Sequence, residues 1–356
     1  MKKIAYIEID THAEIAQDFM DLMQNSKAFS VDYYFSEKIK NQIREDSQTV
    51  HVSDASMILD QLSEKNYDLV IIGTVHRYFN TFFTISQKYN TSVIVHNLNF
   101  SKISKFDLIK NIFKNDQIYR LKLLLKEGLF HTRRTYEKAS NLLILDRDLA
   151  SGKLRFFPLF YTKDFEKNEN EIFTIVIPGG VSQKRRDYKK VIQTIYNIET
   201  EIKKGLDLKN KLIEFVFLGK AKGDELRQII NLERSLENIN IIYFSERVSA
   251  AVFDEWMRKA DVLWCPIQEK AEFFSNEEVY GTTKMTGNLG DAIKYGKPAV
   301  FPENYSSKLE FIIPEEENVI NQFLKLKNFQ YDFQKDFSRE KIRKDAELLL
   351  NQLIST

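Results

Sequence analysis

The chain has 356 residues, more than one hydrophobic core usually supports, so its length predicts two domains. Hydrophobic residues make up 43% and charged residues 29%, and the formal net charge of +1 excludes an overall field that draws the chain to nucleic acid. A single cysteine, Cys265, excludes an internal disulfide and fits a reducing cytoplasm.

In the first half of the chain, short apolar runs alternate with amphipathic stretches. The helix-like segments include "HAEIAQDFMDLMQ" and "DASMILDQLSEK", and the runs of strand length are "KIAYIEI", "SVDYYF", "YDLVIIG", "TSVIVHN" and "NLLILD". Apolar strands joined by helices are typical of parallel sheets covered on both faces. We therefore predict a doubly wound domain over residues 1–165. Because Glu8 precedes any signal-length apolar run, we expect no standard secretion signal, and because no later segment approaches eighteen uncharged apolar residues, we expect no membrane span.

The segment 101–138 is basic, with ten Lys and Arg residues against four acidic residues, a difference of +6. Its charges are interleaved with the apolar stretches "FDLIKNIF" and "IYRLKLLL", a pattern that predicts basic amphipathic helices. Two interpretations stay open, namely packed helices with solvated faces and a docking surface for anionic lipid. No recognised nucleic-acid module accompanies the segment, so we expect no nucleic-acid partner.

The second half repeats the alternation, after the polar candidate linker "TKDFEKNENE" at 162–171. Helical stretches are expected at 187–203, 224–236, 250–259 and 288–294, between the runs "FTIVIPGG", "IEFVFLGKA", "NIIYFS", "ADVLWCP" and "KPAVFP". This pattern predicts a second doubly wound domain over 166–337. The chain closes with an amphipathic helix at 338–356. Ligands of such folds bind at the carboxyl ends of the strands.

Two loops of the second half combine glycines with cations just before a predicted helix. The first, "IPGGVSQKRRD", contains Gly179 and Gly180, and the second, "GTTKMTGNLGD", contains Thr283, Lys284 and Gly287. Free backbone N–H groups at a helix start, together with nearby cations, suit a phosphate. The alternative is that both are tight turns whose glycines serve only packing.

The order and spacing of these motifs resemble a known family. "KRRD" places a lysine and an aspartate at 184 and 187, "RVSAAVFDEWMRKAD" has a valine at 248 and Ala-Asp opening the next strand, and "DAIKYGKP" begins at Asp291. Residues 172–302 thereby resemble the nucleotide-sugar-binding domain of GT-B glycosyltransferases, in particular the glycogen-synthase-like group called family 4. Where that group has two glutamates eight positions apart, this chain has Thr283 and Asp291.

The resemblance implies an α/β protein with the GT-B fold, in which two Rossmann-like domains face a central cleft and the last helix crosses back to the first domain. It also implies a nucleoside diphosphate sugar as donor substrate, no other cofactor and, since no cluster has metal-ligand spacing, no metal. Donor or nucleotide binding is expected of Gly179, Gly180, Lys184, Arg185, Arg247, Val248, Thr283, Lys284 and Gly287.

The acceptor side is expected on the first domain, where polar residues follow predicted strands. His96 ends the run "TSVIVH", and a histidine there could relay a proton, so we predict catalytic roles for His96 and Asp291. Asp10, His12 and His76 are predicted to bind the acceptor. A lone histidine is more often an ordinary hydrogen-bonded residue, and that alternative stays open for His12, His76 and His96.

The function that this implies is transfer of a sugar to a glycan or lipid-linked acceptor, with retention of configuration, in the assembly of a surface polysaccharide. The place is the cytoplasm, with peripheral attachment to the inner face of the cell membrane through 101–138. Two alternatives are a nucleotide-sugar epimerase of the same fold and a non-catalytic relative that serves as a partner or scaffold. Turnover that requires an acceptor distinguishes transfer from both.

Overall fold

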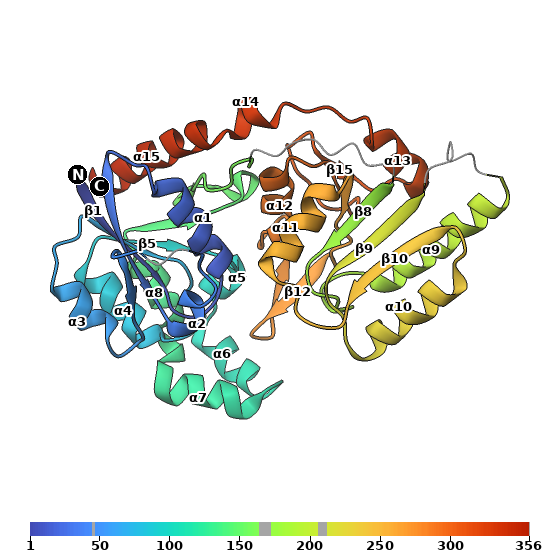
Figure 1. The fold of residues 1–356 in the computed structure, drawn as a ribbon. Helices are drawn as coiled ribbons and strands as arrows, with labels where there is room; N and C mark the ends of the chain where they lie inside the picture. The colour runs from blue at the N-terminus through green and yellow to red at the C-terminus, as the bar shows by residue number, and fades with distance from the viewer. Residues whose placement is uncertain (45–46, 164–171, 206–211, 356) are drawn as a thin grey trace.

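The computed structural model describes residues 1–44, 47–163, 172–205 and 212–355. Most of the predicted linker, at 164–171, therefore lies outside the described residues. Two large sheets, each with helices on both faces, form the architecture (Figure 1). All strand pairs within the two sheets are parallel, as the near-continuous apolar runs indicate.

The first sheet has seven strands in the order β3-β2-β1-β4-β5-β6-β7. Side chains alternate across it, so that Ile4 and Tyr6 pack in one core cluster with Phe19, whereas Ala5 and Ile7 pack in another. The elements of this half are β1 (Lys2–Glu8), α1 (Ala13–Met23), β2 (Phe29–Phe35), α2 (Glu37–Lys40), β3 (Val50–Val52), α3 (Ile58–Ser63), β4 (Leu69–Ile72), α4 (Phe79–Lys88), β5 (Thr91–Ile94), α5 (Leu98–Ser101), α6 (Lys105–Ile112), α7 (Gln117–Glu127), η1 (Leu129–His131), α8 (Thr132–Lys138), β6 (Asn141–Ile144), η2 (Arg147–Leu149) and β7 (Leu154–Phe156).

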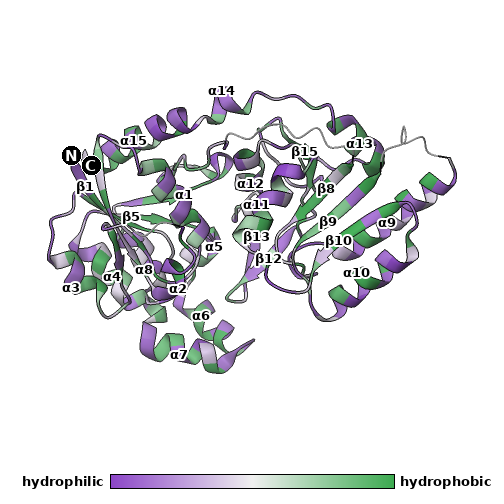
Figure 2. Cartoon of the chain, in the orientation of Figure 1, coloured by the Kyte–Doolittle hydropathy of each residue, from purple (hydrophilic) through white to green (hydrophobic). Residues whose placement is uncertain are grey.

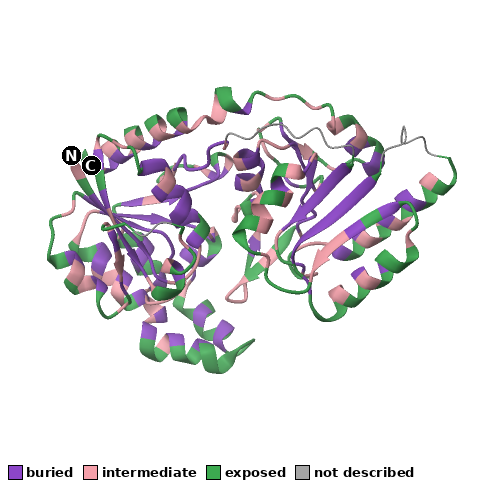
Figure 3. Cartoon of the chain, in the orientation of Figure 1, coloured by how far each residue is buried: buried purple, intermediate pink, exposed green. Residues whose placement is uncertain are grey.

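The second sheet has six strands in the order β10-β9-β8-β11-β14-β15. Its central strands β8 and β9 are buried along almost their whole length and are mostly hydrophobic (Figures 2 and 3). The elements of this half are β8 (Phe173–Pro178), α9 (Tyr188–Lys203), β9 (Ile213–Lys220), α10 (Gly223–Ser235), β10 (Ile239–Phe244), α11 (Ala250–Lys259), β11 (Val262–Trp264), β12 (Lys270–Phe273), β13 (Asn276–Val279), α12 (Gly287–Tyr295), β14 (Ala299–Phe301), β15 (Ile312–Pro314), α13 (Val319–Leu326), α14 (Phe333–Phe337) and α15 (Arg339–Ser355).

The last helix, α15, lies against the first sheet's domain although it follows α13 in sequence (Figure 1). It contacts α1 and accepts hydrogen bonds from the first domain. Lys2 Nζ donates to Asn351 Oδ1 (3.0 Å), and Ser26 Oγ donates to Glu347 Oε1 (2.7 Å). Leu350 and Leu353 are fully buried there. No helix among the described residues is long and apolar enough to span a bilayer.

A small antiparallel hairpin, β12–β13, leaves the second domain and contacts the first. The buried carboxylate of Glu278 accepts hydrogen bonds from the backbone N–H groups of Asn99 (3.2 Å) and Phe100 (2.8 Å) at the start of α5. The ring of Phe273 packs edge-on against that of Phe100, with 4.7 Å between centroids. The hairpin therefore joins the two domains beside the carboxyl end of β5.

Candidate active site

Three histidines meet at the carboxyl ends of the adjacent strands β1, β4 and β5. The rings of His12 and His96 stack with centroids 4.1 Å apart and 13° between their planes. His76 lies 5.8 Å from His96 and 6.0 Å from His12, measured between centroids. Parallel strands end at the same edge of their sheet, so residues 64 and 84 positions away from His12 in sequence become its neighbours. The structure thus unites one predicted catalytic residue with two predicted acceptor residues.

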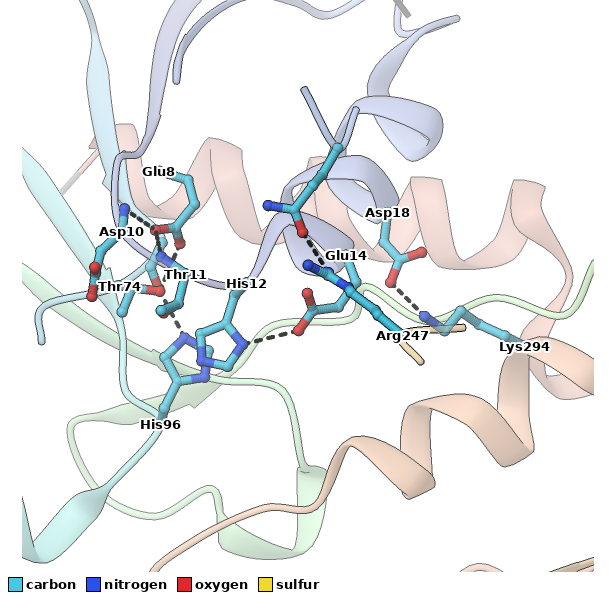
Figure 4. Close-up of polar contacts among 12 residues, drawn as sticks. Glu8, Asp10, Thr11, His12, Glu14, Asp18, Thr74, His96, Arg247 and Lys294 are labelled. Atoms are coloured by element: carbon cyan, nitrogen blue, oxygen red, sulfur yellow. Dashed lines mark hydrogen bonds and ion pairs between the residues drawn. The ribbon is translucent and has the colours of Figure 1, made fainter. Parts of the chain in front are cut away.

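A buried glutamate at the end of β1 holds the loop that carries His12 (Figure 4). Glu8 is fully buried and accepts hydrogen bonds from the backbone N–H groups of Asp10 and Thr11 (3.2 Å each) and from Thr74 Oγ1 (2.6 Å). Next to it, Gly73 leaves no room for a side chain, since a Cβ there would lie 2.6 Å from Glu8 Oε2. The loop ends with His12 in the left-handed conformation, at φ 63°, where α1 begins.

The three histidines differ in their proton affinity. Burial and the nearby His12 lower the pKa of His96 to about 3, and burial holds the pKa of His76 well below its usual range. For His12, burial opposes the proton, but the hydrogen bond and the charge of Glu14 outweigh it and raise the pKa. His12 Nδ1 lies 3.0 Å from Glu14 Oε1. Of these three histidines, His12 therefore has the highest proton affinity.

Burial raises the pKa of Glu8 to about 7, against the hydrogen bonds from Thr74, Asp10 and Thr11 that favour its ionised form. The unfolded chain ionises this group near pH 4.5, so the stability that protonated Glu8 contributes is present below that pH and is lost as the pH rises through 7. We expect Glu8→Gln, which cannot ionise, to become more stable relative to wild type by about 3 kcal/mol between pH 4.5 and pH 8.

Urea denaturation of both proteins across this pH range measures the effect, because the titrations of all other groups cancel in the difference. The matched control is Glu37→Gln, which removes a carboxylate from an exposed position of α2. If the difference between Glu8→Gln and wild type does not change with pH, Glu8 ionises in the folded protein as it does in the unfolded chain.

On the second domain, the two glycine loops meet at the carboxyl end of β8 and the start of α12. Arg186 connects them, because its guanidinium donates to Asn288 Oδ1 (3.0 Å) and to the Gly180 carbonyl (3.3 Å). Asn288 in turn donates to the Pro178 carbonyl (3.3 Å). Gly179 has φ 102°, and a Cβ there would lie 2.3 Å from Arg186 Nη2. Only glycine lets the guanidinium lie against this backbone.

Space remains above these loops at two of the predicted donor residues. A Cβ at Gly180 or at Gly287 would meet no atom within 4 Å. The helix that begins at Gly287 has Thr286 as its N-cap, whose hydroxyl accepts from the Asn288 N–H (3.3 Å). Lys184 and Arg185, which we predicted to supply the phosphate charge, are exposed, whereas their neighbour Arg186 is the cation that lies between the loops.

The loop with Thr283 and Lys284, also predicted donor residues, contacts the first domain beside the three histidines. We call the region where the two domains meet here the junction. Lys284 Nζ donates to Asn97 Oδ1 (2.6 Å), and the Leu98 N–H donates to the Thr283 carbonyl (2.9 Å). Asn97 Nδ2 lies 3.1 Å from His76 Nε2. Lys284 therefore places its charge beside the three histidines, and burial lowers its pKa.

A second contact between the domains joins α1 to α12. Lys294 Nζ lies 2.9 Å from Asp18 Oδ2, and both side chains are almost fully enclosed. Asp291, one turn before Lys294 on α12, accepts a hydrogen bond from Asn288 Nδ2 (3.2 Å). Burial raises the pKa of Asp291, while Lys294 and Arg186 oppose that shift. Asp291 thus lies between the glycine loops and the acidic side chains of α1.

The other predicted residues lie at the margins of this arrangement. Arg247 is exposed and donates to Gln42 Oε1 of the first domain (2.8 Å; Figure 4). Val248 beside it is half-buried. The Asp10 carbonyl accepts from Lys38 Nζ (2.8 Å), and burial raises the pKa of the Asp10 carboxyl. Across the described parts of the chain, no group of three His, Cys, Asp or Glu side chains has a geometry that could hold a metal ion.

Several residues that make these contacts were not predicted as site residues from the sequence. Glu14 and Asn288 hydrogen-bond to the predicted residues His12 and Asp291, and Lys294 pairs with Asp18. Arg186 belongs to the basic cluster of the "KRRD" motif, but only its neighbours Lys184 and Arg185 were predicted as site residues. A helix-start pattern could have indicated Asn288, since Thr286 is a good N-cap. The pairing of Lys294 with Asp18 has no local signal, because 276 positions separate them.

Two parallel-sheet domains that meet at the carboxyl ends of their strands, with the last helix packed on the first domain, define the GT-B fold. No family model matches the chain, and no curated protein sequence does.

Solved structures resemble it over its whole length. The UDP-GlcNAc 2-epimerase from Neisseria meningitidis bound to UDP-GlcNAc has a TM-score of 0.54 at 12% identity, with 99% of this chain and 100% of that one covered. The pneumococcal O-GlcNAc transferase GtfA in complex with UDP and GlcNAc has a TM-score of 0.55 at 10% identity, with 100% and 99% covered. The N-terminal domain of the Candida albicans trehalose-6-phosphate phosphatase has a TM-score of 0.55 at 10% identity, with 100% and 97% covered. At these identities the likeness shows the fold.

Proposed function

We propose that this protein is a glycosyltransferase that moves a sugar from a nucleoside diphosphate sugar to a hydroxyl group of an acceptor. The observation that carries the proposal is the pair of His12 and Glu14 on the first domain, at the junction where Arg186 and the glycine loops of the second domain also lie. Two of the similar structures contain UDP or a UDP-sugar at 10% to 12% identity, which supports the donor class.

The donor diphosphate binds to the open backbone at Gly180 and Gly287 and to the guanidinium of Arg186. Charge on the leaving diphosphate grows as its bond to the sugar breaks, and oriented amides with a fixed cation stabilise that charge without reorganisation. The N-terminus of α12 contributes further, because the positive end of its dipole favours an anion. The backbone at the two glycines, Arg186 and the start of α12 together stabilise the charge on the leaving diphosphate.

The acceptor hydroxyl binds at the histidine cluster and loses its proton to His12. Glu14 holds Nδ1 of the ring and stabilises the imidazolium that forms, which leaves Nε2 for the substrate. His96 supports the ring by stacking and stays neutral, because burial and the nearby His12 lower its pKa. A base beside the acceptor supports direct displacement with inversion at the sugar, in place of the retention that the family resemblance implies.

Incubation with a panel of nucleoside diphosphate sugars, each with and without glycan and lipid-linked acceptors, tests the proposal. Transfer predicts release of nucleoside diphosphate that depends on the acceptor, and the anomeric proton coupling of the product reports inversion or retention. Consumption of the donor without acceptor, with the nucleotide still attached, contradicts transfer. Absence of nucleotide binding would leave the scaffold alternative.

A nucleotide-sugar epimerase is the second candidate, because the junction holds several carboxylates close to a histidine. Glu14 pairs with His12, and Asp18 and Asp291 flank Lys294 on the facing helices. Such groups could remove and return a proton on the sugar itself. An epimerase of this kind incorporates deuterium from heavy water into the donor sugar, whereas a transferase does not, so NMR of recovered donor separates the two.

A further inference from the structure

Two neighbouring helices of the first domain repeat the same surface motif. In α6, Phe106, Ile109, Lys110 and Phe113 occupy positions i, i+3, i+4 and i+7, where Phe113 is the C-cap residue. In α7, the same spacing carries Ile118, Leu121, Lys122 and Leu125. Residues at this spacing lie on one face of a helix. Each helix therefore presents an apolar stripe with a lysine in its middle.

Both stripes are exposed to solvent. The exposed fraction is 76% for Phe106, 68% for Phe113, 88% for Ile118 and 74% for Leu125. Isolated exposed apolar residues are normal, but an aligned group on two packed helices marks an interaction surface. We call the surface formed by these eight residues of α6 and α7 the apolar-lysine face.

The opposite sides of the two helices fix its orientation. Leu108 and Ile112 of α6 and Leu123 of α7 are buried in the core cluster of the first domain. Arg120 of α7 is also buried and donates to the Asn111 carbonyl and to Ser275 Oγ. Since these inward contacts hold both helices, the apolar-lysine face points away from the core, where α6 and α7 project from the molecule (Figures 1 and 3).

We propose that the apolar-lysine face docks the protein on an anionic phospholipid bilayer. Around it, the exposed lysines of 102–126 number six, at 102, 105, 110, 114, 122 and 126, against two exposed carboxylates, at 107 and 116. The lysines bind lipid phosphates while the apolar side chains beside them enter the hydrocarbon below. Lysines alone or apolar side chains alone bind a bilayer only weakly. The inference concerns an interaction surface and does not rest on the proposed function.

The chemistry of the face favours lipid over two other occupants. Nucleic acid binds through aromatic stacking and cations together. Phe106 and Phe113 give the face two rings on α6, but its α7 half is aliphatic, since Ile118, Leu121 and Leu125 offer no ring for a base. A second copy of the chain would bring two lysine-rich faces against each other, and like charges at a contact are unfavourable. An anionic bilayer satisfies both the aliphatic side chains and the charges.

Docking through this face places the histidine side of the junction near the membrane. Glu127 at the end of α7 accepts from Arg77 Nε (3.1 Å) and from the Tyr78 N–H (3.2 Å). Both residues directly follow His76 in the chain. The helices that carry the face are thus tied to the segment that carries one histidine of the cluster, so an acceptor held in the bilayer would be presented from that side.

Co-sedimentation of the full chain with vesicles tests the proposal. One vesicle type is pure phosphatidylcholine and the other contains equal parts of phosphatidylcholine and phosphatidylglycerol. We expect binding to the anionic vesicles, weakened by high salt. The combined variant Phe106→Ser, Ile118→Ser and Leu125→Ser should lower this binding at least tenfold. Replacing Lys110 and Lys122 by Gln should lower it about fivefold for each lysine.

The matched controls are Leu348→Ser and Lys344→Gln on α15, which change an exposed leucine and an exposed lysine elsewhere on the same domain. Thermal unfolding confirms that each variant is folded. Unchanged binding in the α6 and α7 variants, or equal losses in the controls, would overturn the proposal. So would a dimer abolished by the serine variant, or tighter binding to a single-stranded oligonucleotide than to anionic vesicles.

Discussion

Arg186→Ala is expected to weaken binding of a nucleoside diphosphate about tenfold or more and to leave binding of the nucleoside nearly unchanged. A charge-assisted contact to phosphate contributes on the order of 1.5 to 3 kcal/mol to binding. A nucleoside has no phosphate and therefore never makes this contact. The contact is specific to this arginine because its guanidinium lies between the Gly180 carbonyl and Asn288, in front of the glycine loops. Calorimetric titration of both ligands into both proteins measures the difference.

Two further variants make the test sharper. Arg186→Lys keeps the charge but loses the planar fork, so we expect an intermediate loss. Lys184→Ala removes an exposed cation two positions away and serves as the matched control, with little change expected. Equal losses of nucleoside and nucleoside diphosphate affinity in Arg186→Ala would mean that the glycines and this arginine serve packing between β8 and α12.

Lys284→Ala should also weaken the diphosphate more than the nucleoside if Lys284 contributes charge to the site. Its hydrogen bond to Asn97 Oδ1 across the junction adds a second expected effect, namely a lower melting temperature, because the variant loses a contact between the domains. Comparison with Asn97→Ala separates the two, since that variant removes the same contact and keeps the charge.

His12→Ala is expected to lower the turnover number by a factor on the order of a hundred to ten thousand, with little change in nucleotide affinity, as removal of a general base does. His96→Ala should cause a smaller loss, because the low pKa of His96 and its contact with the Gly73 carbonyl suit support of the His12 ring. Steady-state kinetics with a saturating donor measures both. A larger loss in His96→Ala than in His12→Ala would return the catalytic role to His96.

The pH profile gives an independent test of the pair of His12 and Glu14. A base acts in its unprotonated form, so activity should rise with pH through the pKa of His12. Glu14 raises that pKa, and Glu14→Gln should therefore move the rise to lower pH. The Glu14 side chain is 63% exposed, so solvent screens the pair and we expect a modest shift. An unmoved profile would contradict the role of Glu14.

The two sheets could be predicted because their information is local. Runs such as "YDLVIIG" and "FTIVIPGG" are apolar over strand length, and burial on both faces of a parallel sheet needs that composition. The hairpin β12–β13 was not predicted, because "KAEFFSNEEV" mixes charges with aromatics in no strand-like alternation. Phe273 of the hairpin packs against Phe100 of α5 in the other domain, a contact that the periodicity of the segment alone does not signal.

The sequence by itself determined which side chains stand at the ends of strands and where glycines open the backbone, because both depend on a few neighbouring residues. Only the tertiary structure decided which of these residues meet. The strand order places β4 next to β1 and β5 next to β4, which stacks His96 on His12 and brings His76 beside them. Within "KRRD", Lys184 and Arg185 are exposed, whereas Arg186 lies against Gly179 and donates to Asn288. Contacts between residues far apart in sequence depend on how whole elements pack, and no short segment encodes that packing.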